Sequence, residues 1–195
     1  MSDGRTWDFQ TSRDNYTNEH YTPPELVEKL AEDLGVVFTL DPCATPESAK
    51  AERFFTIHDN GLAQDWSGEV VFCNPPYSDI KEWIIKCANS GAALVAALVP
   101  CRFDTSVFQE VVLGSASRLL LVRGRVKFGN ALHAAPFPSV IIIWDRERRG
   151  NPIAEAWKPK RDPLHSLQLF PDVEIVDRPV VPHDAGINFT LDDED

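Results

Sequence analysis

The chain has 195 residues, 43% of them hydrophobic and 25% charged, and its formal net charge at pH 7 is −11. This length accommodates one α/β domain with a proper core, and no apolar run reaches the roughly 20 residues of a membrane-spanning helix. Because the N-terminus has no apolar signal region, we expect a cytoplasmic protein. The four cysteines include no C-x-x-C pair, which argues against a metal site or a disulfide framework and favours buried free thiols.

Charge is unevenly distributed along the chain. Residues 1–101 carry 7 basic and 16 acidic side chains, residues 102–161 carry 11 and 5, and residues 162–195 carry 1 and 9. The central part is therefore basic and lies between two acidic ends. This pattern indicates a localised surface for an anionic partner, and a solvated face without a partner is the alternative.

The sequence from 22 to 35 predicts a helix. Thr22 is a candidate N-cap, Pro23 suits the first turn, and Glu25 completes a capping box. Apolar residues then recur at helical spacing, and Gly35 is a plausible stop.

Apolar runs bounded by turn residues predict the remaining strands and helices. We expect strands at residues 36–40, 53–57, 70–73, 93–99, 118–122, 126–128 and 139–144. We expect helices at residues 78–88 and 104–113, and Ser78 to cap the first of them. The run at 93–99 has the continuous apolar character of a strand that is buried on both faces.

These elements divide the chain into three parts. A polar arm, residues 1–19, comes before the domain at residues 20–145. Residues 146–195 are rich in proline and in acidic side chains, so we expect an extended segment that wraps the domain and ends in disorder.

The stretch Asn74-Pro75-Pro76-Tyr77 follows the predicted strand at 70–73, at the edge where open α/β sheets bind ligands. Proline fixes φ, lacks an N–H and restricts the preceding residue, so the two prolines make a stiff, extended stub. The stub presents the Asn74 side-chain oxygen and backbone carbonyls as acceptors, with the Tyr77 ring beside them. This combination suits a planar group that carries an NH2. A turn after a buried strand, with Tyr77 as ordinary packing, is the alternative.

The tetrapeptide resembles the acceptor motif of S-adenosylmethionine-dependent methyltransferases that act on planar amino groups. Further short boxes occur around it in a fixed order, and together they are similar to the phage-type (Dam-like) DNA N6-adenine methyltransferases over residues 20–145. These boxes are Tyr21-Thr22-Pro23, Leu40-Asp41-Pro42-Cys43-Ala44, Asp59-Asn60-Gly61-Leu62, Asp65-Trp66, the segment from Leu98 to Thr105, and Gly124-Arg125-Val126-Lys127-Phe128.

The resemblance implies a Rossmann-like α/β methyltransferase sheet with flanking helices, S-adenosylmethionine as cofactor, and DNA with a flipped-out adenine as substrate. It implies site-specific methylation of adenine N6, which protects phage DNA from restriction in the bacterial host cytoplasm. It assigns catalysis to Asn74, Pro75, Pro76 and Tyr77.

Two further sets of residues follow from this assignment. Cofactor groups donate hydrogen bonds to carboxylates and carbonyls, and the residues implied for these contacts are Tyr21, Thr22, Pro23, Asp41, Pro42, Asp59 and Asp65. An Asx-turn is the alternative role for Asp59, and a plain surface acid is the alternative for Asp65. The basic side chains expected to grip phosphates are Arg102, Arg118, Arg123, Arg125 and Lys127.

The chain departs from the common methyltransferase pattern in two ways. No glycine-rich loop follows the first predicted strand, where Cys43-Ala44 supplies only small residues. Only 33 positions separate Asp41 from Asn74, whereas one βαβ unit takes about 30 residues. We therefore expect a sheet that is pruned in this region.

The amine of adenine is a poor nucleophile because its lone pair is delocalised into the ring. We expect the Asn74 side chain and the Pro75 carbonyl to hold its two hydrogens while Tyr77 stacks on the flipped base. The alternatives are a methyltransferase of the same fold that acts on RNA adenine, cytosine N4 or protein glutamine, and an inactive DNA-binding prophage remnant.

Overall fold

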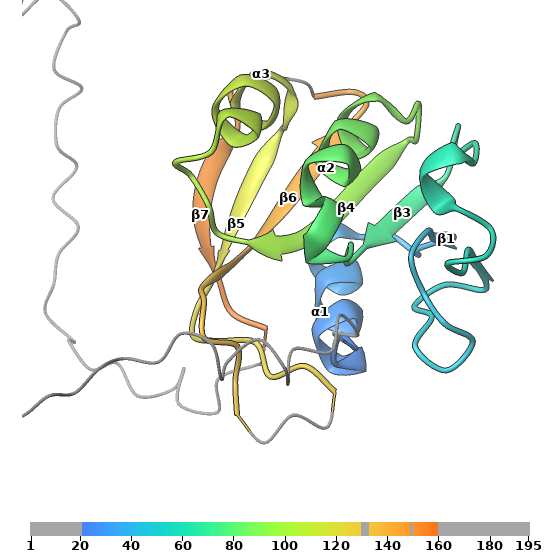
Figure 1. Ribbon diagram of the computed structural model, residues 1–195. Coiled ribbons are helices and arrows are strands. Elements are labelled where there is room, and N and C mark those ends of the chain that lie inside the picture. The colour runs from blue at the N-terminus through green and yellow to red at the C-terminus, as the bar shows by residue number, and fades with distance from the viewer. Residues whose placement is uncertain (1–20, 130–132, 149, 160–195) are drawn as a thin grey trace, which may run out of the picture. The chain divides into compact units, whose positions relative to one another are not determined.

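The computed structural model describes residues 21–129, 133–148 and 150–159, which contain a seven-stranded sheet (Figure 1). The strands are β1 Leu40–Asp41, β2 Arg53–Phe54, β3 Val70–Cys73, β4 Leu94–Pro100, β5 Arg118–Val122, β6 Ser139–Asp145 and β7 Ile153–Trp157. The helices are α1 Pro24–Leu34, α2 Ile80–Asn89 and α3 Leu113–Ser115, with 3-10 turns η1 Gly61–Ala63 and η2 Tyr77–Asp79 and a π-helix η3 Phe108–Val112. Among the described residues, no helix is long and apolar enough to cross a membrane.

The strand order is β2-β1-β3-β4-β6-β5-β7. β6 is antiparallel to both of its neighbours, and every other neighbouring pair is parallel. The C-terminal ends of six strands therefore lie at one edge of the sheet, and the first residue of β6, Ser139, lies at the same edge because it pairs with Pro100 at the end of β4. We call this the carboxyl edge. Open α/β sheets bind their ligands there.

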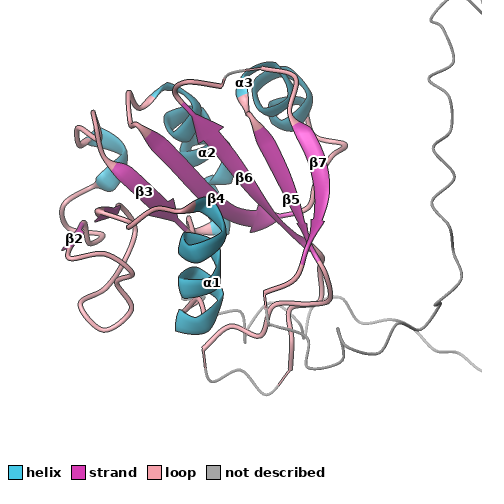
Figure 2. Cartoon of the chain, turned by 180° about the vertical axis from the view of Figure 1, so that it is seen from behind, coloured by secondary structure: helices cyan, strands magenta, loops and turns pink. Residues whose placement is uncertain are grey.

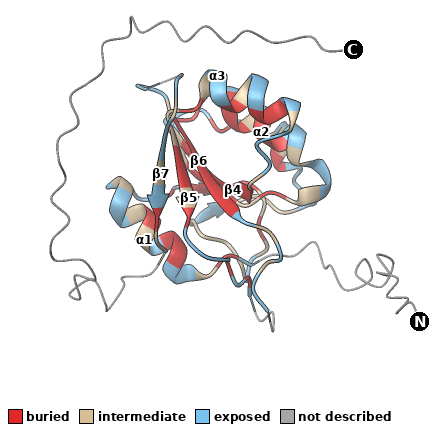
Figure 3. Cartoon of the chain, turned by 90° about the vertical axis from the view of Figure 1, so that its left-hand side faces the viewer, coloured by how far each residue is buried: buried red, intermediate tan, exposed pale blue. Residues whose placement is uncertain are grey.

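Helices cover both faces of the sheet (Figure 2). Helix α1 lies on one face, where its buried side chains pack against alternate residues of β3, β4, β5 and β6. Helix α2 and the helical segment η3–α3 cover the other face. Figure 3 shows that the central strands β4 and β6 are buried almost throughout. Burial on both faces is typical of a central strand in an α/β sheet.

The structure confirms the Rossmann-like sheet and its pruning. Between Asp41 and Asn74 the chain forms only the two-residue strand β2, the turn η1 and β3. The strands predicted at 70–73 and 118–122 have the predicted bounds. The strand predicted at 93–99 is β4 with both ends moved by one residue, and the strand predicted at 139–144 is β6 with its last residue moved by one.

The predicted capping box at the start of α1 is wrong. Pro23 is the N-cap, with φ −56° and ψ 130°, and no side chain caps the helix. Pro24 follows it and disfavours the helical region for Pro23, so the helix begins one residue later than the box requires. The predicted stop is confirmed, since Gly35 ends α1 in the left-handed region at φ 66°.

Five other elements differ from prediction. Of the strand expected at 53–57, only the two residues of β2 are strand. The strand expected at 36–40 is paired only from Leu40, and residues 126–128 form no strand. Ser78 lies in the 3-10 turn η2, where its hydroxyl donates to Asp79 at 2.9 Å, and Asp79 is the N-cap of α2. The helix expected from 104 begins at 106 and passes into the π-helix η3.

Strand β7 was not predicted, and it lies within the segment expected to wrap the domain. It pairs in parallel with β5, and Trp157 donates its indole N–H to Asp33 at 2.8 Å. Only Trp157 of this edge strand is buried, so the sequence has no apolar run to mark it. The expectations for residues 1–19 and for the acidic end lie outside the described residues.

The turn at Asn60-Gly61 packs directly against the end of β1. A Cβ added to Gly61 would lie 1.9 Å from the carbonyl oxygen of Pro42 and 3.2 Å from the ring of Trp83. Only a residue without a side chain allows this approach. The contact joins two of the sequence boxes, around Asp41 and around Asp59, at the carboxyl edge.

We expect Gly61→Ala to lower the free energy of unfolding by about 1–3 kcal/mol or more, because the new methyl group collides with backbone atoms. Gly114→Ala is the matched control, since a Cβ on this helical glycine meets nothing within 4 Å. It is expected to leave stability unchanged or to raise it by about 0.5–1 kcal/mol. Urea denaturation of both variants measures the difference, and equal stabilities would contradict the close packing at Gly61.

Candidate active site at the carboxyl edge

Asn74 is held at the end of β3 by the residue that precedes α1 by two positions. Its side-chain amide donates from Nδ2 to Oγ1 of Thr22 at 3.0 Å. Thr22 is 3% exposed, and Asn74 is half-buried. This bond joins residues that are 52 positions apart and turns the oxygen end of the Asn74 amide away from Thr22. Thr22 therefore positions Asn74 rather than capping α1.

The stub after Asn74 is partly covered. Pro75 is buried, and Pro76 is extended at φ −61° and ψ 136° before the turn η2 begins at Tyr77. The ring of Tyr77 meets the ring of Phe137 edge-on, with 5.4 Å between the centroids. Phe137 lies just before β6, and an isolated aromatic residue near a predicted strand was its only signal in the sequence. The contact brings the segment before β6 beside the Asn-Pro-Pro-Tyr stretch.

Asp41 is a buried carboxylate at the end of β1. It is 4% exposed and accepts hydrogen bonds from the backbone N–H groups of Lys50 at 3.1 Å and Cys43 at 3.4 Å. Burial raises the pKa of Asp41 to about 6, while the two backbone donors and the Lys50 charge lower it. No salt bridge to another described residue compensates this carboxylate. A buried charge without such a partner is costly, which suits a site that receives a cation.

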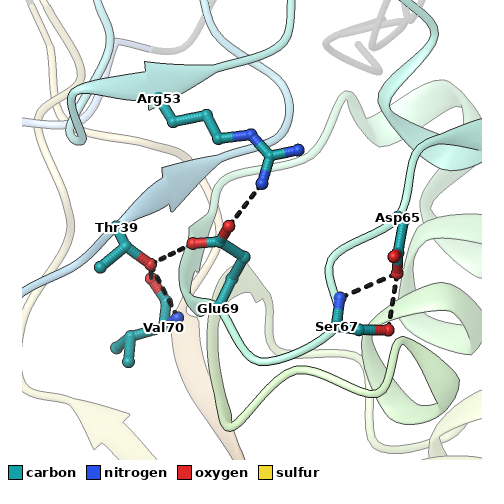
Figure 4. Close-up of polar contacts among 6 residues, drawn as sticks. All are labelled: Thr39, Arg53, Asp65, Ser67, Glu69 and Val70. Atoms are coloured by element: carbon teal, nitrogen blue, oxygen red, sulfur yellow. Dashed lines mark hydrogen bonds and ion pairs between the residues drawn. The ribbon is translucent and has the colours of Figure 1, made fainter.

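Two other acids of the predicted cofactor set lie in different surroundings. Asp59 is exposed and accepts hydrogen bonds from the backbone N–H and the hydroxyl of Thr56 at 2.8 and 2.7 Å, which lower its pKa. It precedes Gly61 and so belongs to the turn that contacts Pro42. Asp65 instead comes before β3 and accepts from the backbone and hydroxyl of Ser67, which lower its pKa (Figure 4).

Tyr21 and Pro23 flank the positioning residue Thr22. The backbone carbonyl of Tyr21 accepts a hydrogen bond from Gly129 N–H at 2.7 Å, and the Tyr21 ring is 38% exposed. The segment after β5 therefore packs beside the segment that leads into α1, at the same edge as Asn74.

The five basic side chains of the predicted phosphate surface do not all lie together. Arg102 follows β4, and the other three that lie at the carboxyl edge follow β5, all of them exposed: Arg123, Arg125 and Lys127. Arg118 begins β5, so it lies at the opposite edge, where its guanidinium forms an ion pair with Glu155 at 2.7 Å. Arg118 therefore belongs to a different part of the surface.

A cavity of about 1050 Å³ lies between α1 and the segment that leads into β2, and none of residues 74–77 lines it. Three of its lining residues lie at the N-terminal ends of β1, β2 and β3. There the Glu69 carboxylate contacts both Arg53 and the hydroxyl of Thr39 (Figure 4). These contacts tie the starts of three short strands together, away from the carboxyl edge.

Comparison with known proteins identifies a family and two similar proteins. Residues 10–162 match the family described as DNA N-6-adenine-methyltransferase (Dam). A DNA N-6-adenine-methyltransferase of Haemophilus phage HP1 is 26% identical over 112 residues, which are 56% of this chain and 65% of that protein, slightly less than two thirds of its length. A solved structure of a putative RNA methyltransferase from Pyrococcus horikoshii aligns with a TM-score of 0.45 and 13% identity, over 62% of this chain and 81% of that one.

The burial of Asp41 predicts a pH dependence of stability. Its pKa in the folded protein is about 6, above the ordinary 3.8, so the folded state holds this proton more tightly than the unfolded state. Between these two values the free energy of unfolding should therefore fall as pH rises, by up to about 3 kcal/mol. Asp41→Asn removes this dependence.

Urea denaturation of the wild type and Asp41→Asn from pH 4 to pH 7 measures the effect as the difference between the two proteins. Asp59→Asn is the control, because the pKa of this exposed acid is lowered. Its contribution to the free energy of unfolding therefore changes below pH 4, where it falls as pH falls. A constant difference between wild type and Asp41→Asn across the range would show that Asp41 is not desolvated.

Proposed function

The chain belongs to the DNA N-6-adenine-methyltransferase (Dam) family, and from this membership we propose that it transfers a methyl group from S-adenosylmethionine to adenine N6 in DNA. The observation that carries the proposal is the placement of Asn74. Its amide is anchored through Nδ2 to Thr22 at the carboxyl edge, so Nδ2 is already engaged and Oδ1 is the end that we propose for the adenine amine. Tyr77 follows three residues later and supplies a ring beside it.

The chemistry required of the chain is mainly positioning. Asn74 Oδ1 and the Pro75 carbonyl accept the two hydrogens of the adenine amine, which draws the nitrogen toward a tetrahedral geometry and frees its lone pair for attack. Tyr77 stacks on the flipped base and holds its plane. The extra proton leaves the nitrogen after transfer, so no basic side chain is needed beforehand. Fixed dipoles of this kind lower the barrier without reorganising during the reaction.

The residues at the ends of β1 and β2 fit the proposed cofactor. S-adenosylmethionine carries a sulfonium and an ammonium and supplies an electrophilic methyl group when it is bound. Asp41 is a buried carboxylate that no described side chain neutralises by a salt bridge, and Asp59 lies on the turn that packs against Pro42. We propose these two acids, with Tyr21, Thr22, Pro23 and Pro42, as the residues that hold the cofactor. Asp65 lies before β3 and bonds to Ser67, so it is not part of this set.

We propose that DNA phosphates contact Arg102, Arg123, Arg125 and Lys127, which are exposed at the carboxyl edge. We also propose that the catalytic domain reaches at least to Trp157, because β7 is part of the same sheet and the family match ends at 162. A cytoplasmic location stays a prediction from the sequence.

Nucleoside mass spectrometry of DNA incubated with the protein and S-adenosylmethionine tests the activity. We expect N6-methyladenine from the wild type and none from Asn74→Ala, which should retain cofactor binding in a calorimetric titration because Asn74 contacts the acceptor. Parallel reactions with RNA and with protein substrates cover the other acceptors. N4-methylcytosine, or methylation of RNA or protein alone, would replace adenine in DNA as the acceptor, and near wild-type turnover by Asn74→Ala would refute its role.

The DNA surface is tested by the salt dependence of binding. Each phosphate that a basic side chain neutralises adds about −0.9 to the slope of log affinity against log salt concentration. Arg123→Ala with Arg125→Ala should weaken binding and flatten the slope by about two units in fluorescence anisotropy titrations of a labelled duplex. Arg118→Ala is the control at the opposite edge and should keep the wild-type slope. An unchanged slope in the double variant would show that Arg123 and Arg125 form only a solvated face.

A further inference from the structure

The hydroxyl of Ser139 is buried at the carboxyl edge without a hydrogen-bond partner. Ser139 is 3% exposed, and its Oγ has no hydrogen-bond partner among the described residues. Two other serines of this sheet region differ, because the Ser117 hydroxyl donates to Ile143 at 2.9 Å and Ser115 donates to Val111 at 2.6 Å. Nine in ten or more buried polar groups in proteins are bonded, so this hydroxyl needs an explanation.

Ser139 lies on the same face of the sheet as Asn74. Along β6 the side chains alternate, and Ile141 packs in the cluster on the α1 face, so Ser139 points to that face as well. Asn74 reaches the same face, because its amide bonds to Thr22, two residues before the start of α1. Both residues are therefore on the side of the carboxyl edge that α1 and the Tyr21 segment border.

The separation of Asn74 and Ser139 matches the size of a purine with a hydrogen bond at each side. The two residues are two strands apart, with β4 between them. Ser139 pairs with Pro100 of β4, and Pro100 lies two residues beyond the β4 residue that is level with Asn74. Strand spacing and rise place their Cα atoms about 12 Å apart. A base with a hydrogen bond of about 2.8 Å at each side spans about 10 Å, which two side chains that project from the same face of the sheet can bridge.

The contact between Tyr77 and Phe137 brings the Asn-Pro-Pro-Tyr stretch close to the start of β6. Phe137 is half-buried, lies two residues before Ser139 and meets Tyr77 edge-on at 5.4 Å. A base stacked on Tyr77 would take the place of this edge contact and lie near the start of β6, where Ser139 is.

We propose that Ser139 Oγ donates a hydrogen bond to the ring nitrogen of the flipped adenine opposite its amine, N3, and so positions the base for transfer. This inference rests on the proposed function. Asn74 and Ser139 then hold the two opposite sides of one base, which fixes the direction of the amine in the plane of Tyr77. In the protein without bound DNA the hydroxyl lowers the free energy of unfolding, because a buried polar group without a hydrogen bond costs about 1–3 kcal/mol.

This cost provides a test that separates the proposed role from a structural one. Ser139→Ala should unfold at the same or a higher urea concentration than the wild type, while kcat/KM on duplex DNA falls about 5- to 50-fold. Ser139→Cys keeps the shape and a weak donor, so it should recover part of the activity. Ser117→Ala is the matched control, which should lose stability because its two hydrogen bonds disappear and should keep its activity.

Modified substrates identify the atom. Duplexes carrying 3-deazaadenine at the target should be methylated 5- to 50-fold less efficiently than adenine by the wild type but equally well by Ser139→Ala. With 7-deazaadenine, the methylation efficiency relative to adenine should be the same for the wild type and for Ser139→Ala. The proposal is overturned if Ser139→Ala loses stability as Ser117→Ala does, if it keeps wild-type kinetics on adenine, or if it still discriminates against 3-deazaadenine. Absence of methylation by the wild type on every duplex contradicts instead the proposed function.

Discussion

The hydrogen bond from Asn74 Nδ2 to the Thr22 hydroxyl joins the start of α1 to the end of β3 at 3.0 Å. Its two residues are 52 positions apart in the sequence, and the packing of α1 against the sheet brings their segments together. The bond orients an amide whose two ends differ in chemistry, so it decides which end is presented at the edge. A rigid support suits this purpose, because a catalytic group displaced by about 1 Å loses much of its effect. The prolines on both sides, Pro23 and Pro75, restrict the backbone next to each partner.

The loop after β1 packs against β3 through small and apolar side chains. Cys43 and Cys73 place their sulfurs 3.6 Å apart, and burial raises the pKa of both thiols. Thiols of this kind stay protonated and act as compact packing groups. The four cysteines are free, as the sequence predicts. A glycine-rich loop allows backbone segments to approach closely. In this protein, small side chains and the tight contact of Gly61 with Pro42 allow the same close approach.

The two edges of the sheet have different electrostatic character. At the N-terminal ends of the strands, opposite charges are paired, as in Arg53 with Glu69 and Arg118 with Glu155. At the carboxyl edge, the basic side chains after β4 and β5 are exposed, and the one buried acid, Asp41, lacks a salt bridge to any described residue. Charges that are paired with each other stabilise the fold modestly and are less available to ligands. Exposed basic side chains and a carboxylate without a salt bridge remain available to ligands. A net charge of −11 is therefore compatible with an edge that binds an anion.

The sequence by itself determined the central strands, the end of α1 at Gly35, the pruning between Asp41 and Asn74, and the position of Asn-Pro-Pro-Tyr after β3. Apolar runs, glycine and proline act locally, so their effects are readable without a fold. Only the tertiary structure decided that Thr22 bonds to Asn74, that Phe137 meets Tyr77, that Arg118 lies far from the other basic residues, and that β7 joins the sheet. Each of these depends on which strands are neighbours and in which direction they run. That information arises from long-range pairing, which a local pattern of residues does not contain.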